Sequence, residues 1–257
     1  MFEVENIHLL TLIFFFIALF YSLVGLGGGS SYIALLIFWG ISHKVAPSIA
    51  LICNIIVVFG GTVHFFKNDN LSYKFISPFL ILSVPFAYLG GLIPIEKELY
   101  QSILGLALLI AAYKMLFLKK DRFSLMTYIE SPPLFPSAMI GGILGLVSGL
   151  VGIGGGIFLA PLLYILKWGN PKRIAASSSA FILINSFSGL FGQLQKSEGL
   201  ENIYHYLPLL LSVFIGGQLG SWFCNNRISF RKIEVLTSLL VFLVSLKLFS
   251  NVLAYYN

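Results

Sequence analysis

Of the 257 residues, 58% are hydrophobic and only 10% are charged. About a quarter of the residues of a soluble globular protein are charged, so this chain cannot cover its surface with charge and must expose much of it to lipid. The net charge of +6 would suggest nucleic acid in a soluble protein, but in an apolar chain we expect no nucleic-acid partner and interpret the charge by its distribution.

Long apolar runs with few or no charged residues dominate both halves of the chain. Most approach or exceed the roughly 20 residues that a helix needs to cross the ~30 Å hydrocarbon core, and two shorter runs follow glycine clusters. A backbone within lipid must be helical, because its polar groups find no other partners there. We therefore predict an all-α, polytopic integral membrane protein. Its ten segments, in chain order, are 9–26, 30–41, 45–66, 75–94, 99–118, 134–153, 157–166, 174–192, 203–223 and 233–253.

The basic residues predict the orientation of these segments. If all ten cross, eleven Lys and Arg residues fall in loops on one face, and only Lys44, Lys97 and Lys196 fall on the other. If the two short runs instead re-enter the face they came from, the counts become eight and six. Cytoplasmic loops carry an excess of Lys and Arg, so ten crossings are favoured and both termini are expected to be extracytoplasmic. Full crossing by the short segments stays open.

The two halves of the chain are related in sequence. The matching elements are the two glycine triplets, 127 residues apart, Asn54 and Asn185, 131 apart, and Leu89-Gly90 and Leu219-Gly220, 130 apart. A nearly constant offset predicts an internal repeat, with residues 1–118 as the first membrane repeat, 119–133 as a cytoplasmic linker and 134–257 as the second. Five segments per repeat force the second to insert upside down. Inverted repeats with glycine-broken segments are typical of secondary transporters.

The glycine triplets are the first part of a predicted substrate site. They are Gly27, Gly28 and Gly29 in the first repeat and Gly154, Gly155 and Gly156 in the second. Each glycine disfavours a helix interior by about 1 kcal/mol, so we expect the helix to break there and a short helix to start within the membrane. Free N–H groups at such a start favour an anion. The alternative is that the glycines only allow close helix packing; their equivalent positions favour the site.

Neutral polar residues in the segments after the triplets complete the predicted site. They can donate hydrogen bonds to an oxyanion without a buried charge, although such residues also hold membrane helices together. Ser178 and Asn185 lie seven residues apart and so share a helix face. The polar members of the predicted site are Ser48, Asn54, Ser177, Ser178, Asn185 and Gln193.

Other function classes fit the sequence less well. No Asp or Glu lies in the middle of an apolar run, which disfavours a proton relay through a buried carboxylate, and there is no Walker motif for ATP. The residues around Ser148 loosely resemble the serine motif of rhomboid proteases, but the glycine spacing differs and this role would not explain the repeat. We therefore predict no enzymatic activity, no catalytic residue, no metal and no cofactor.

The doubled glycine element resembles the TauE/SafE sulfite exporter family, together with Pro161 and the polar stretch 175–189. The resemblance extends over nearly the whole chain and implies a multi-pass protein of a bacterial or archaeal plasma (inner) membrane. It implies transport of a small anion such as sulfite, a sulfonate or another organosulfur anion. We predict a secondary transporter that works by alternating access; an uncoupled anion channel or facilitator is the alternative. The oligomeric state stays open, with a homodimer as one option.

The first repeat departs from the second in part of this pattern. Ala34 stands where the second repeat has Pro161, and Pro47-Ser48-Ile49 stand where it has Ala176-Ser177-Ser178. The two halves of the predicted site are therefore not expected to be chemically equivalent.

Overall fold

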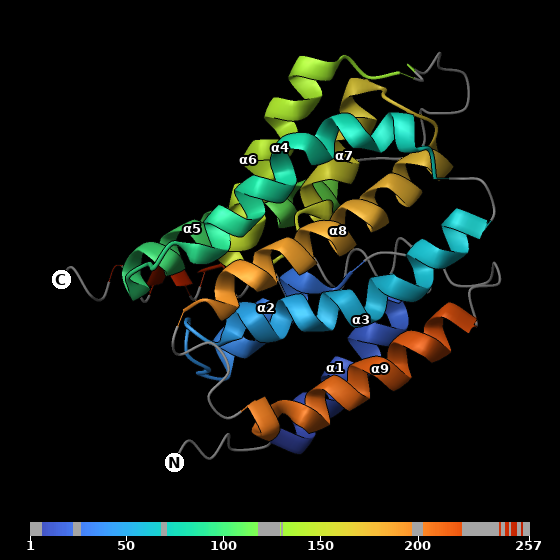
Figure 1. Cartoon of the computed structure of the whole chain (residues 1–257). Coiled ribbons are helices and arrows are strands. Elements are labelled where there is room, and N and C mark those ends of the chain that lie inside the picture. The colour runs from blue at the N-terminus through green and yellow to red at the C-terminus, as the bar shows by residue number, and fades with distance from the viewer. Residues whose placement is uncertain are drawn as a thin grey trace.

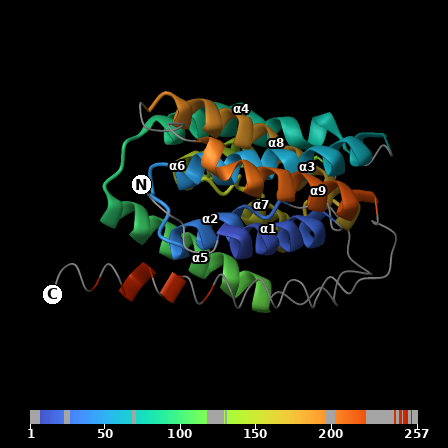
Figure 2. The same cartoon turned by 90° about the horizontal axis from the view of Figure 1, so that it is seen from below.

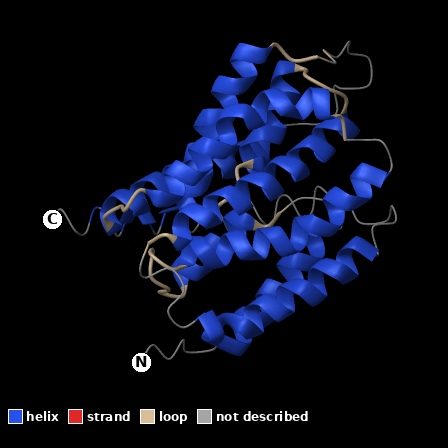
Figure 3. Ribbon diagram, in the orientation of Figure 1, coloured by secondary structure: helices blue, strands red, loops and turns tan. Residues whose placement is uncertain are grey.

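The computed structural model describes residues 7–22, 27–67, 71–117, 129, 131–196 and 203–222, and seven positions between 242 and 253. Helices make up almost all of this part of the chain (Figure 3), which confirms the predicted all-α class. The last predicted segment, 233–253, lies mostly outside the described residues. So do most of the linker 119–133 and both termini.

Each of the first nine predicted segments contains a helix. The helices are α1 (Ile7–Ser22), α2 (Gly29–Phe38), α3 (Ala46–Lys67), α4 (Tyr73–Leu92), α5 (Lys97–Phe117), α6 (Leu134–Val151), α7 (Gly156–Leu166), α8 (Pro171–Leu194) and α9 (Leu207–Trp222), with a 3₁₀ turn, η1 (Ile203–Tyr206), before α9. Local sequence explains several of the ends. Ile93 precedes Pro94 and is extended, because proline disfavours the α conformation in the residue before it. Asn170 caps α8 by accepting a 3.0 Å hydrogen bond from the Arg173 N–H.

The helices form two layers. In each layer, the helices of one half of the chain, followed from one end, occur in the same order as their counterparts of the other half, followed from the other end. Figures 1 and 2 show α4, α8, α3 and α9 side by side in one layer, with α6, α7, α2 and α1 behind them. Across the layers α4 packs along α6, and α9 packs along α1. Helix α5 contacts α6 and α7 on the side of the second layer that faces away from α4 and α8. Helices α3 and α8, each the third of its half, meet in the middle of the first layer.

The contact between α4 and α6 depends on a row of glycines. Three glycines at intervals of four residues on α6 lie so close to α4 that a side-chain carbon would collide with its backbone carbonyl groups. The pairs are Gly141 with Phe79, Gly145 with Ser83 and Gly149 with Ala87. Membrane helices associate through such close van der Waals packing, because lipid provides no hydrophobic force between them.

The contact between α1 and α9 repeats this geometry. Gly90 of α4 faces the carbonyl oxygen of Leu146 on α6, and Gly220 of α9 faces the carbonyl oxygen of Leu19 on α1. The two glycines are 130 residues apart and the two leucines 127, the same offsets that relate the two halves in sequence.

Four of the described helices are long and apolar enough to cross a bilayer. The qualifying stretches are Ala46–Val63, Tyr73–Leu92, Leu134–Val151 and Lys172–Leu194. They belong to α3, α4, α6 and α8, the helices that surround the centre of the protein. Helix α2, with 10 residues, and α7, with 11, are too short to cross alone at 1.5 Å per residue.

We expect Gly145→Ala to destabilise the protein by about 1–3 kcal/mol, because the new methyl group overlaps the backbone of Ser83 and forces α4 and α6 apart. Gly105→Ala on α5 is the matched control. A carbon there would lie 3.4 Å from the Phe249 ring, an ordinary contact. Thermal unfolding of both variants in detergent measures the difference, and equal midpoints would show that the α4–α6 contact does not need glycine.

Candidate functional site

The two glycine breaks lie against each other in the middle of the structure. Gly29, the first residue of α2, is so close to Ile153, in the break between α6 and α7, that a side chain on Gly29 would collide with the Ile153 carbonyl oxygen. The predicted helix break is therefore present at both triplets. The short helices α2 and α7, from opposite halves of the chain, start at neighbouring positions.

Asn54 of α3 bridges the two breaks. Its Nδ2 donates a 2.9 Å hydrogen bond to the Ile153 carbonyl oxygen, and the residue is fully buried. A side-chain carbon on Gly27 would lie 2.7 Å from Asn54 Oδ1, and one on Gly154 would lie 2.9 Å from Asn54 Nδ2. The amide thus fills the space that the glycines of both halves leave open.

The two breaks use glycine for different reasons. Gly152, Gly154 and Gly155 have φ angles of +85°, +81° and +76°, a left-handed conformation that glycine adopts without steric cost. Gly28, by contrast, has φ −88°. In the first break the glycines are required by space: a carbon on Gly28 would lie 2.8 Å from Ile17 of α1.

Helix α8 carries buried polar side chains, of which Ser186 is placed at the second break. Ser177, Ser178, Asn185 and Ser186 are fully buried. Their Oγ and Oδ1 atoms, like Ser48 Oγ and Asn54 Oδ1, have no hydrogen-bond partner within the described part of the chain. Buried polar atoms are nearly always paired, so a group of unpaired ones is available to a ligand or to water.

Ser186 is a polar residue of α8 that the sequence analysis did not include in the site and that the structure places beside the second break. A side-chain carbon on Gly154 would lie 2.9 Å from Ser186 Oγ. The signal in the sequence was its position directly after Asn185. Ser178 reaches the same break through its carbonyl oxygen, 3.1 Å from the position of such a carbon on Gly156.

The hydrogen bonds of the two asparagines determine which of their atoms a ligand would meet. Asn185 Nδ2 donates to the Phe181 carbonyl oxygen of its own helix at 2.9 Å, and Asn54 Nδ2 donates to Ile153. The atom of each that has no partner is therefore the acceptor Oδ1, which repels an oxyanion, and each Nδ2 has only one further N–H to donate. The serine hydroxyls and the first N–H groups of α2 and α7, which have no partner within their helices, are better suited to contact an anion.

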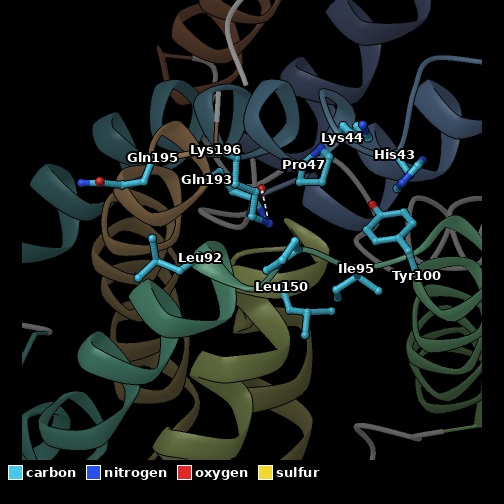
Figure 4. A pocket seen from close by; sticks show the side chains of 11 residues that line it. His43, Lys44, Pro47, Leu92, Ile95, Tyr100, Leu150, Gln193, Gln195 and Lys196 are labelled. Atoms are coloured by element: carbon cyan, nitrogen blue, oxygen red, sulfur yellow. Dashed lines mark hydrogen bonds between the residues drawn. The ribbon is translucent and has the colours of Figure 1, made fainter. Parts of the chain in front are cut away.

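Gln193, the last residue of the predicted site, lies elsewhere, in a pocket of about 350 Å³ at the end of the protein where α3 begins and α4, α6 and α8 end (Figure 4). Gln193 is buried; its Nε2 donates to the Gly149 carbonyl oxygen at 2.8 Å, and its Oε1 accepts from Lys196 Nζ at 3.1 Å. Residues of both halves line this pocket.

Three basic residues in the pocket, His43, Lys44 and Lys196, were not predicted as site residues. Burial lowers the pKa of Lys196 to about 8, and burial, with the positive charges of Lys44 and Lys97, lowers the pKa of His43. Near neutral pH Lys196 is therefore mostly charged and His43 mostly neutral. The available signal was that Lys44 and Lys196 are two of only three basic residues on that face of the predicted topology.

Long apolar helices pack closely at glycines, and two broken helices meet at a buried polar centre. These features are typical of a multi-pass membrane protein of the transporter class. The chain belongs to the sulfite exporter TauE/SafE family, which it matches over residues 10–248. This confirms the family resemblance seen in the sequence.

Two relatives match most of the chain, and both are described as probable membrane transporter proteins. One, from Sinorhizobium fredii, is 35% identical over 93% of this chain and 96% of its own length. The other, from Methanocaldococcus jannaschii, is 28% identical over 90% of both chains. No solved structure matches the chain.

We expect Asn54→Leu to destabilise the protein more than Asn185→Leu does. The first change leaves the buried Ile153 carbonyl, which lies outside any helix, without its partner, at a cost of about 1–3 kcal/mol. The Phe181 carbonyl lies inside α8 and keeps its main-chain hydrogen bond. Thermal unfolding in detergent compares the two variants of equal shape. Equal loss in both would mean that Asn54 does not hold the breaks together.

Proposed function

We propose that this protein is a secondary transporter that carries a small anion, such as sulfite, a sulfonate or another organosulfur anion, across a bacterial or archaeal plasma membrane by alternating access. The observation that carries the proposal is the contact between the start of α2 and the break that precedes α7, from opposite halves, beside the buried Ser186 hydroxyl, which has no partner among the described residues. Membership of a family named for sulfite export supports the choice of substrate class.

The chemistry of the centre suits an anion. The starts of α2 and α7 provide N–H groups and the positive ends of two helix dipoles. The hydroxyls of Ser178 and Ser186 can rotate to donate. In membrane transporters, half-helix starts of this kind face anionic substrate groups near the midplane.

The proposed architecture is a 5+5 inverted repeat with residues 1–118 and 134–257 as its halves. The symmetric packing order supports it, since α4 with α6 corresponds to α9 with α1, and α3 pairs with α8. The matching contacts of Gly90 and Gly220 also support it. In such a transporter one helix bundle moves against another around a fixed central site. The full burial of Asn54, Ser178 and Ser186 is expected of an occluded state rather than an open pore.

The proposed orientation places both termini outside the cytoplasm and can be tested at two exposed residues. Ser42, between α2 and α3, and Lys172, in the first turn of α8, are both exposed. They belong to opposite faces in this topology. We expect Ser42→Cys to react with an impermeant maleimide from outside intact cells and Lys172→Cys to react only after the membrane is opened. The reversed pattern would invert the topology, and labelling of both from one side would revive the re-entrant arrangement. Cys53 is buried, and Cys224 should be replaced beforehand.

We expect Ser178→Ala and Ser186→Ala to weaken transport while leaving the fold intact. Removing a buried hydroxyl that has no partner is neutral or stabilising for the protein, but it removes a donor to the anion, at a cost of about 1–3 kcal/mol in binding. Uptake of radiolabelled sulfite and sulfoacetate by proteoliposomes should show a KM raised several-fold to about a hundredfold.

Ser102→Ala is the control for this experiment, because Ser102 Oγ donates to the Glu98 carbonyl oxygen on α5, away from the centre. Normal kinetics in both centre variants would place the site elsewhere. In the same vesicles, unlabelled anion on the far side should accelerate uptake in an alternating-access carrier. Failure to accelerate it would favour an uncoupled channel or facilitator.

A further inference from the structure

We propose that the pocket between His43, Lys44 and Lys196 is a second anion site, which holds a small sulfonate or related oxyanion at one end of the protein. The pocket itself is the basis for the proposed anion binding. A second part of the proposal, that this site receives the substrate before the centre does, rests on the proposed transport function.

The pocket has the charge that an anion requires. Among the described residues that line it, His43, Lys44 and Lys196 are basic and none is acidic. Glu96 and Glu98 line, together with Lys97, an adjacent and more open hollow that shares His43 and Lys44. The carboxylates thus line the adjacent hollow, and the two lysines and the histidine line the pocket.

Lys196 is held in place rather than free in solvent. Gln193 is 2% exposed, and its hydrogen bond to the Gly149 carbonyl fixes the direction of the Oε1 atom that Lys196 contacts. An ammonium group has three donors, and this contact uses one. Leu92, Ile95 and Leu150 form apolar walls, and a low-dielectric wall strengthens attraction between a lysine and an anion.

The size of the pocket suits a small, partly hydrated anion. Its volume of about 350 Å³ corresponds to roughly ten water molecules at about 30 Å³ each. A one-carbon or two-carbon sulfonate therefore fits together with several waters.

The floor of the pocket lies over the second glycine break. Pro47 lines the pocket, and a side-chain carbon on Gly152, the first residue of that break, would lie 2.6 Å from the Pro47 Cα. Gln193 contacts Gly149 in the last turn of α6, directly before the same break. An anion in the pocket is thus one layer of residues away from the predicted central site.

The partial burial of Lys196 gives the site a pH dependence. Burial lowers the pKa of Lys196 to about 8, and a bound anion favours the charged amine and so raises this pKa. Binding is therefore strongest below pH 8 and weakens as the pH rises through 8. The other titratable groups that line the pocket are His43, Lys44 and Tyr100, with Glu96, Lys97 and Glu98 in the adjacent hollow.

The test uses the full chain in detergent and measures the reactivity of each lysine with trace acetic anhydride by mass spectrometry between pH 6 and 10. The probes are methanesulfonate, an anion throughout this range, and dimethyl sulfone, its neutral analogue of similar shape. We expect methanesulfonate to raise the pH at which Lys196 reaches half of its maximal reactivity, its labelling midpoint, by about one unit. This shift lowers the reactivity of Lys196 at pH 8 about fivefold. Dimethyl sulfone should have no effect. Lys97, an exposed residue of the adjacent hollow, is the internal control and should change much less than Lys196.

An unchanged Lys196 midpoint at saturating methanesulfonate, or an equal change with the sulfone or at Lys97, would overturn the proposal. The wild-type experiment does not depend on a variant folding. Lys196→Gln, with Lys97→Gln as its control, should then abolish the pH dependence of methanesulfonate binding measured by calorimetry. Protection of Lys196 without transport in vesicles would refute the proposed function but leave the site standing, whereas transport without protection would refute only the site.

Discussion

The contact between the two glycine breaks is the constraint on which the rest of the centre depends. Two helices that start inside a membrane leave N–H groups and carbonyls without water to bind, so their starts must approach each other or a polar side chain closely. Gly29 allows the backbone of α2 to reach Ile153, and Asn54 satisfies the Ile153 carbonyl from α3. Any side chain larger than hydrogen at Gly29 would separate the two halves where they meet, which explains why the triplets and Asn54 belong to one structural unit.

Around this centre, glycine has a second and purely mechanical role. The rows on α6 and α9 bring whole helices into backbone contact with α4 and α1, so each of these pairs is expected to move as a rigid unit. These pairs combine helices from different halves of the chain: α4 with α6, and α9 with α1. A movement of one pair against the other must therefore pass through the α3–α8 contact between them, where Thr62 and Ser179 share a 2.9 Å hydrogen bond. The α3–α8 contact, which such a movement would have to change, is formed by the same two helices that carry the polar residues of the predicted substrate site.

The sequence predicted what is local or repeated and missed what depends on distant contacts. Apolar length gave nine of the ten segments within a few residues, and the spacing of the triplets and of Asn54 marked the centre. The partner of Asn54 is 99 residues away, and no local pattern identifies it. Gln193 resembled a residue of the centre because it is polar and lies at the end of an apolar run, but its place in the last turn of α8 puts it in the pocket. Lys196 appeared to be an ordinary loop lysine, because the pocket that it lines is completed by residues distant in sequence, such as Pro47, Leu92 and Leu150.

The two halves of the centre are not equivalent, and this bears on direction. Asn54 reaches across to the other half while Asn185 bonds its own helix, and of the matched glycines Gly28 and Gly155 only Gly155 is in the left-handed conformation. A positive pocket at one end of such a protein raises the local concentration of anions there and speeds their capture. The same attraction slows their release to that side, and a binding energy at one face cannot change the equilibrium across a membrane. The asymmetry can therefore set the rates at each face, while net import or export must follow from the anion gradient or from a coupled ion.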